Sequence, residues 1–258
     1  MRSFTNIVYK EGLTLEMHLP DEGAFPVFVY FHGGGLYAGG TYCKPFDKTL
    51  CDHGCGIVSV EYRLYHRKEG EPQTVRYPDY IEDCADALRW VFDHIGEYGE
   101  CRGIYAGGSS AGGYISMCLC FDRSHLARVG LKPLDLAGFV HDAGQPTAHF
   151  TVLKNDFGVD SRRVIVNETA PLYHIGEDEK YPPMLFIVSD QDMENRYEQT
   201  MLVLSTLRHF GHTEKDGIYS RIVHGTHCAY VYETDEDGEA KFGKMILDLI
   251  AKAEALKA

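Results

Sequence analysis

The chain has 258 residues, of which 44% are hydrophobic and 24% charged, and its formal net charge at pH 7 is −13. This acidic balance argues against nucleic acid or an anionic membrane as a partner, because both are bound through basic patches. No apolar run approaches the roughly 18 residues that a membrane span requires, so no membrane partner is expected.

The amino terminus and the cysteines favour a cytoplasmic location. The opening stretch MRSFTNIVYKEG contains no apolar segment of the kind found in secretory signals. Without such a signal, the eight cysteines are expected to be reduced thiols. Neither Cys51 with Cys55 nor His224 with His227 has the paired spacing of a structural zinc site, so no metal is expected.

Short apolar runs alternate with helical patterns along the chain. The runs predict strands at residues 13–19, 26–31, 56–62, 103–108, 136–144, 182–192 and 217–225. The helical patterns cover residues 110–121, 197–211 and 239–256, together with a helix that opens at Pro78-Asp79. In that helix one face carries the apolar side chains of Tyr80, Cys84, Ala87, Leu88, Val91 and Ile95.

This alternation predicts an α/β fold with a mostly parallel sheet and helices on both faces. No repeat or linker divides the sequence, and one domain is expected over residues 1–258. Ligand sites in such sheets form beyond the carboxyl ends of the strands. The unusual residues of this chain follow the predicted strands, so we expect the functional site at that edge.

Ser110 is the candidate nucleophile. It stands in Gly108-Ser109-Ser110-Ala111-Gly112, a G-x-S-x-G sequence between an apolar strand and a helix. The chain must turn there within very few residues, so the neighbouring positions require glycine, and the serine hydroxyl is exposed on the turn. The next N–H, that of Ala111, then points from a helix terminus toward a developing oxyanion.

The stretch YFHGGGLYAGG, residues 30–40, predicts further oxyanion donors. Three glycines follow His32 at the end of a buried strand. A bare backbone can bring its N–H groups within hydrogen-bond distance of a reacting oxygen. We expect Gly33 and Gly34 to complete the oxyanion hole with Ala111, with Gly35 as a third candidate and His32 shaping the loop.

A serine nucleophile needs a base and an acid that orients the base. His227 follows the last predicted strand and is the preferred base, with His224 in the same turn as its rival. Asp192 follows the preceding strand and is the preferred acid. Asp190 and Asp142 remain alternatives by position. The order Ser110, Asp192, His227 is that of nucleophile, acid and base in α/β hydrolases.

These motifs together resemble the α/β-hydrolase superfamily, and within it esterases of the hormone-sensitive-lipase and bacterial acetyl or feruloyl esterase type. The matching stretches are His32–Gly35, Val60–Leu64 and Gly108–Gly113, followed by Asp192 and His227. Two positions depart from the family pattern: Glu61 replaces its frequent Asp, and Ser109 replaces the acid of GDSAGG. The second departure favours the smaller acetyl or feruloyl branch.

The resemblance implies a serine carboxylesterase that uses a Ser-His-Asp triad, an acyl-enzyme and no cofactor. The chain is short for this family, so little or no cap is expected, and an open site suits short acyl groups. The substrate would be a small-molecule or oligosaccharide ester, with acetyl groups on plant-wall carbohydrate as the favoured class. The sequence carries no signal for the oligomeric state.

Several alternatives stay open at this stage. An amide hydrolase, such as an arylformamidase or a peptidase, would use the same residues, and a non-catalytic binding protein could share the fold. Residues 147–167 could form a small lid, a partner surface or an ordinary crossover helix. Tyrosines near the predicted site loops could stack on a sugar or a phenolic acid, or could simply belong to the core: Tyr37, Tyr42, Tyr62 and Tyr65.

Overall fold

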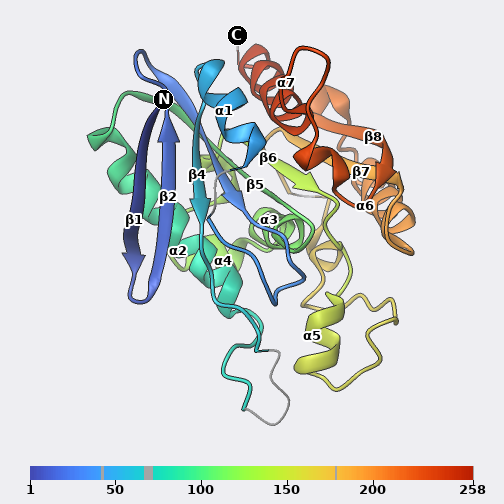
Figure 1. The fold of residues 1–258 in the computed structure, drawn as a ribbon. Helices are drawn as coiled ribbons and strands as arrows, with labels where there is room; N and C mark the ends of the chain where they lie inside the picture. The colour runs from blue at the N-terminus through green and yellow to red at the C-terminus, as the bar shows by residue number, and fades with distance from the viewer. Residues whose placement is uncertain (42–43, 67–71, 178, 258) are drawn as a thin grey trace.

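The computed structural model describes residues 1–41, 44–66, 72–177 and 179–257. Its centre is one eight-stranded sheet in the order β1-β2-β4-β3-β5-β6-β7-β8 (Figure 1). The strands are β1 (Arg2–Lys10), β2 (Leu13–Leu19), β3 (Phe25–Phe31), β4 (Gly56–Val60), β5 (Cys101–Ser109), β6 (Gly138–Asp142), β7 (Met184–Gln191) and β8 (Ile218–Thr226). Strands β3 to β8 run parallel, while β2 is antiparallel to both β1 and β4.

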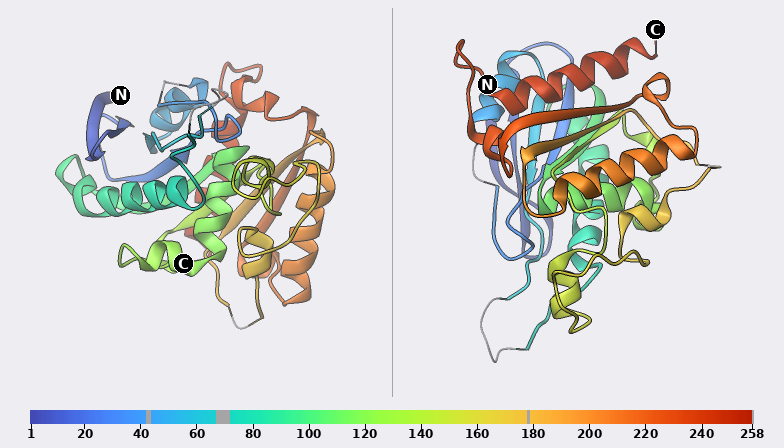
Figure 2. Two further views of the ribbon diagram at one scale, coloured as in Figure 1. Left: turned by 90° about the horizontal axis from the view of Figure 1, so that it is seen from below. Right: turned by 90° about the vertical axis from the view of Figure 1, so that its right-hand side faces the viewer.

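Helices cover both faces of the sheet. The main helices are α1 (Pro45–Asp52), α2 (Asp79–His94), α3 (Ala111–Phe121), α4 (Arg123–Ala127), α5 (Phe150–Asn155), α6 (Arg196–His209) and α7 (Lys241–Ala255). Side chains of α1 and α7 pack in one apolar cluster, and those of α2, α3 and α6 pack in the other. Figure 2 shows α7 and α6 on opposite sides of the sheet. The predicted α/β architecture is therefore confirmed.

The position of β3 in the sheet explains why its sequence is almost entirely apolar. Val27, Val29 and Phe31 face the cluster of α2, α3 and α6, whereas Phe28 and Tyr30 face that of α1 and α7. A parallel strand at the centre of a sheet is buried on both sides, so alternation with polar residues disappears. The strand therefore delivers the glycine loop at its end from a fixed, central position.

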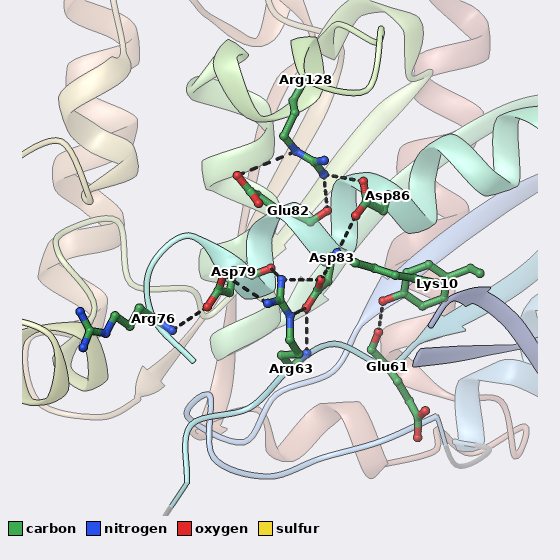
Figure 3. Close-up of polar contacts among 10 residues, drawn as sticks. Lys10, Glu61, Arg63, Arg76, Asp79, Glu82, Asp83, Asp86 and Arg128 are labelled. Carbon is green, nitrogen blue, oxygen red and sulfur yellow. Dashed lines mark hydrogen bonds and ion pairs between the residues drawn. The ribbon is translucent and has the colours of Figure 1, made fainter. Parts of the chain in front are cut away.

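Charged side chains fix the segment that follows β4 (Figure 3). Arg63 donates to both carboxylate oxygens of buried Asp83 on α2, from Nε at 2.7 Å and from Nη2 at 2.9 Å. Lys10 at the end of β1 donates to the same carboxylate at 2.6 Å. Burial alone would raise the pKa of Asp83, but these contacts outweigh it and the pKa lies below its usual range. Asp83 thus joins α2 to the segment after β4 through Arg63 and to the edge strand β1 through Lys10.

Strand β1 and helices α1 and α4 lie outside the sequence predictions. Strand β1 pairs with β2 through two register shifts, which interrupt the alternation of apolar and polar residues. Helix α1 has only eight residues, too few to show a helical period. Its signals are Pro45 at the first helical position and the apolar pair Phe46 and Leu50 at i, i+4 spacing.

The segment between β6 and β7 lies beyond the carboxyl ends of the parallel strands, where Figure 1 shows α5. Helix α5 has six residues. Thr151 Oγ1 donates to the Gly35 carbonyl at 2.7 Å, and Asn155 Nδ2 donates to Tyr37 Oη at 2.5 Å. Of the roles considered for residues 147–167, a small lid held against the glycine loop fits this position better than a crossover helix on the sheet.

Candidate active site

Ser110 sits between β5 and α3 with φ +56° and ψ −112°, a backbone conformation that side chains rarely adopt. Its N–H donates to the Asp142 carbonyl at the end of β6 at 2.8 Å, which secures the turn. At the glycines on either side of Ser110 there is no room for a side chain. A Cβ at Gly108 would lie 2.3 Å from the Phe31 carbonyl oxygen, and one at Gly112 would lie 1.9 Å from the same atom. The sharp turn therefore requires glycine on both sides of Ser110.

The glycine loop passes directly beside this turn. A Cβ at Gly33 would lie 3.0 Å from the Ser109 carbonyl oxygen and 3.4 Å from Ser110 Cβ. Gly34 has φ +116°, and a Cβ there would lie 1.9 Å from the Ala38 carbonyl oxygen. Within the described residues, no protein group accepts a hydrogen bond from the N–H of Gly33 or Gly34. The loop thus brings free backbone donors next to the serine.

His32 holds the loop in shape. Its ring stacks on Tyr62 with centroids 4.2 Å apart, and its Nδ1 lies 2.8 Å from the Gly33 carbonyl. Because a carbonyl only accepts, Nδ1 must donate to it. Burial lowers the pKa of His32 to about 4, so the ring is neutral at pH 7. Tyr62 donates in turn to the His32 carbonyl at 2.6 Å.

Three side chains distant in sequence meet at the strand ends. His227 Nε2 lies 2.8 Å from Ser110 Oγ, and His227 Nδ1 lies 2.5 Å from Asp192 Oδ1. Asp192 follows β7 and His227 follows β8, which are neighbours in the sheet. Parallel strands end at the same edge, so the loops after β5, β7 and β8 can reach one another there. The preferred residues of the sequence analysis are those that come together.

The side chain of Asp192 is completely buried and accepts several hydrogen bonds. Besides His227, the N–H of Met193 donates to Oδ1 at 2.8 Å and the N–H of Ser189 to Oδ2 at 3.3 Å. Burial by itself would raise the pKa of Asp192, but these contacts outweigh it and the pKa lies below its usual value. Asp192 is therefore ionised at neutral pH and can stabilise a proton on His227.

The alternative residues form separate pairs. His224 Nδ1 lies 2.8 Å from Asp190 Oδ2, and this exposed pair has no contact with Ser110 among the described residues. Asp142 is buried and accepts a hydrogen bond from Tyr230 Oη. Burial raises the pKa of Asp142 to about 7. Neither Asp190 nor Asp142 contacts the ring of His227.

A pocket of about 450 Å³ opens above Ser110, and we call it the serine pocket. Besides the residues already described, its lining includes Tyr30, Lys44, Phe150, Met193, Val231 and Tyr232. Sequence reasoning did not select these side chains. Phe150 begins the six-residue helix α5 and Met193 lies in the loop after β7, and periodicity gives no signal at either position.

Three of the four tyrosines considered as stacking partners for a substrate lie in the described part of the chain. Tyr62 and Tyr65 are buried, and Tyr65 Oη donates to Asp156 Oδ2 at 2.7 Å. Tyr37 lies against Tyr65 with ring centroids 6.1 Å apart. None of these three lines the serine pocket, whereas Tyr42 lies outside the described residues. Tyr62 and Tyr65 are thus better interpreted as core residues than as stacking partners of a substrate.

Two further properties concern only the described part of the chain. No helix there is both long and apolar enough to cross a membrane. No three His, Cys, Asp or Glu side chains there gather in an arrangement that could hold a metal ion.

A family model described as alpha/beta hydrolase fold matches residues 28–201. This range exceeds half of the chain, and the chain belongs to that family. The esterase LipI of Mycobacterium tuberculosis is 39% identical over 102 residues, which are 38% of this chain and 29% of LipI. The chain thus aligns with less than a third of the length of this curated relative.

Solved structures share the fold over nearly the whole chain. A truncated carbohydrate esterase from gut microbiota has a TM-score of 0.73 at 16% identity, covering 99% of this chain and 97% of its own. Brefeldin A esterase, described as a bacterial homologue of human hormone sensitive lipase, has a TM-score of 0.68 at 19% identity. That match covers 99% of this chain and 76% of the esterase. The predicted resemblance to this group is confirmed, and identities this low show the fold alone.

Proposed function

We propose that the protein is a serine carboxylesterase that hydrolyses short-chain acyl esters. The observation that carries the proposal is the continuous contact from Ser110 Oγ through His227 to buried Asp192, with the glycine loop beside the serine. A hydroxyl next to a base that is itself oriented by a carboxylate is the arrangement of an activated nucleophile. The names of the similar proteins, esterases in all three cases, support the same activity.

The mechanism follows from the direction of each contact. Ser110 Oγ attacks the ester carbonyl carbon while His227 Nε2 accepts the hydroxyl proton, and Asp192 stabilises the imidazolium through Nδ1–H. His227 then gives the proton to the leaving alcohol as the C–O bond breaks. Water loses a proton to His227 and attacks the acyl carbon. The bond from that carbon to Ser110 Oγ then breaks, Ser110 Oγ takes the proton back from His227, and the acid is released. No cofactor enters these steps.

The oxyanion hole of this proposal consists of the N–H groups of Gly33, Gly34 and Ala111. Ala111 is the first residue of α3, and the first four N–H groups of a helix have no partner within the helix. The helix dipole adds positive potential at the same place. The N–H of Ser110 itself is already used by the Asp142 carbonyl, so it is not one of the donors.

The size of the serine pocket favours short acyl groups. A pocket of about 450 Å³ is at the small end of the range for ligand sites, roughly 300–1,000 Å³. Phe150 at the start of α5 and Met193 after β7 form part of its lining. Acetyl groups on carbohydrate are the favoured substrates within this class. The name of the carbohydrate esterase with a similar fold supports this choice.

Hydrolysis of 4-nitrophenyl acetate, butyrate and octanoate by the wild type and Ser110→Ala tests the proposal. We expect kcat/KM to fall with chain length and to drop by about 10⁴ or more in the variant. N-formyl and peptide substrates assayed in parallel address the amide hydrolase alternative. Faster turnover of those substrates than of any ester would replace the proposal by amide hydrolysis. No turnover of either class would favour a non-catalytic binding protein.

A further inference from the structure

A second pocket of about 410 Å³ adjoins the serine pocket, and both share Phe150 and Met193 as walls. We call it the arginine pocket because three of its lining side chains are arginines, namely Arg162, Arg163 and Arg196. The catalytic steps proposed above leave it unused. Its cationic lining is unexpected in a chain with a formal net charge of −13.

Arg196 forms the inner wall of this pocket. It is the first residue of α6 and is only 4% exposed. Its Nη1 donates to the Ala143 carbonyl at 2.5 Å, the one hydrogen bond of its guanidinium among the described residues. Burial lowers the pKa of Arg196, while the negative charge of Asp192 acts in the opposite direction. A buried guanidinium with one neutral contact is incompletely compensated, and an anion in the pocket would supply the missing charge.

Gln199 presents a second donor, and a chain of hydrogen bonds fixes its orientation. The N–H of Phe150 donates to Gln145 Oε1, so Gln145 Nε2 is the nitrogen that donates to Thr147 Oγ1 at 3.1 Å. Thr147 Oγ1 therefore donates a hydrogen bond to Gln199 Oε1 at 3.0 Å. This leaves the Nε2 of Gln199 as a pure donor. Gln199 lines the pocket, and no protein group in the described part of the chain accepts a hydrogen bond from this Nε2.

The charges at the rim add to this donor set. Arg162 is exposed and forms an ion pair with Asp160, so its charge is already balanced. Arg163 has no carboxylate partner among the described residues. Glu194 is the acidic member of the described lining and is exposed to solvent. Arg196 and Gln199 at the base, with Arg163 at the rim, leave an excess of positive charge and of donors.

We propose that the arginine pocket binds a carboxylate carried by the ester substrate. Arg196 offers the paired N–H geometry that suits a carboxylate, and Gln199 offers a further N–H at the same wall. The natural substrate is then an acidic ester, with its charged group remote from the carbonyl that Ser110 attacks. This inference rests on the proposed esterase function and narrows its substrate class. The carboxylate belongs either to the alcohol, as in an acid sugar, or to the acyl group, as in a dicarboxylic monoester.

Two matched pairs of esters test the inference and separate these sources. Phenyl acetate against 4-acetoxybenzoate places the charge on the alcohol, and 4-nitrophenyl butyrate against mono-4-nitrophenyl succinate places it on the acyl group. Rates are normalised to alkaline hydrolysis of each ester. We expect kcat/KM to favour the anionic member of one pair by at least tenfold, and the favoured pair identifies the source. A ratio at or below one in both pairs, with the neutral esters still hydrolysed, overturns the inference and leaves the proposed function intact.

Substitutions test whether the preference for anionic esters arises in the arginine pocket. We expect Arg196→Met to reduce the anionic-to-neutral ratio by at least tenfold, Gln199→Met to reduce it by at least threefold, and Arg196→Lys to retain part of it. Arg208→Met is the matched control, because it removes one positive charge from the exposed end of the same helix. If Arg196→Met does not fold, Gln199→Met and Arg163→Met carry the test. Equal ratios in wild type and the pocket variants would contradict the assignment.

Binding without turnover provides an independent measurement. Calorimetry on Ser110→Ala compares 4-acetamidobenzoate with acetanilide and N-methylsuccinamate with N-methylbutyramide. We expect the anionic member of one pair to bind at least tenfold more tightly, with an affinity that falls as sodium chloride is added. This readout remains valid even if no ester is hydrolysed. Equal affinities within both pairs would overturn the inference.

Discussion

Gly112 packs against the carbonyl group of Phe31 so closely that a Cβ at Gly112 would lie 1.9 Å from the oxygen. Phe31 ends β3, which carries the glycine loop, and Gly112 stands in the first turn of α3, which follows Ser110. The distance between the candidate nucleophile and its candidate oxyanion donors is therefore set by contact between two backbones. Side-chain adjustment cannot relieve a change at this point.

Replacing Gly112 by alanine tests this contact. We expect Gly112→Ala to lower the free energy of unfolding by about 3 kcal/mol or more, or to prevent folding, because the methyl group overlaps backbone atoms. Gly96→Ala is the matched control, since a Cβ there meets no atom within 4 Å and the backbone is not left-handed. Urea denaturation measures both. A change under 0.5 kcal/mol in Gly112→Ala would show that the close approach is not real.

The two His–Asp pairs can be separated by matched substitutions. We expect Asp192→Asn to reduce kcat by about 10³–10⁴, because His227 loses both its orientation and the charge that stabilises the imidazolium. Asp190→Asn removes the same charge from the exposed pair with His224 and should change kcat less than twofold. Steady-state kinetics on 4-nitrophenyl acetate decides between them. The reverse order of effects would transfer the acid role to Asp190.

Buried Asp142 predicts a pH dependence of stability. Burial raises its pKa to about 7, whereas the pKa in the unfolded chain is about 4. Between these values the folded state holds a proton that the unfolded state releases, so stability falls as the pH rises. We expect the wild type to lose about 2–3 kcal/mol more than Asp142→Asn between pH 5 and pH 8, measured by urea denaturation. Parallel curves for the two proteins would rule out a protonated Asp142.

The ion pair of Arg63 and Asp83 should contribute strongly to stability. We expect Arg63→Met to cost about 3 kcal/mol, because it leaves a carboxylate of zero exposure with fewer partners. In the double variant with Asp83→Asn the loss should be smaller than the sum of the single losses by at least about 1 kcal/mol.

Arg89→Met is the control for that cycle, since its pair with Asp93 also involves α2 but lies at the surface. Its effect should stay within about 0.5 kcal/mol. Strict additivity of the Arg63 and Asp83 substitutions would contradict the proposed bridge between β4 and α2.

Strands β2 to β8 and helices α2, α3, α6 and α7 were predictable because each has a clear apolar signature. The nucleophile turn was predictable as well, because Gly108, Ser110 and Gly112 are forced on the sequence by one backbone geometry. The choice of Asp192 and His227 over their neighbours depended on position after a strand. The structure shows the reason, since Asp190 and His224 form an exposed pair with each other, away from Ser110.

The pocket walls could not be predicted in the same way. Phe150, Met193 and Arg196 lie on loops or at a helix start, where their positions depend on how separate segments close over the sheet. Strand β1 was missed because its irregular pairing hides the alternation that identifies a half-buried strand. Helix α1 was missed because two turns are too short for a period. Both depend on tertiary contacts, which local sequence does not report.

Labelling with a 4-nitrophenyl alkylphosphonate tests the central claim most directly, because it reports a nucleophilic serine whatever the natural substrate is. We expect the wild type to release one equivalent of 4-nitrophenol per chain, mass spectrometry to place the phosphonate on Ser110, and Ser110→Ala to release none. Failure to label the wild type, or a label on another residue, would contradict the assignment of Ser110 as an activated nucleophile.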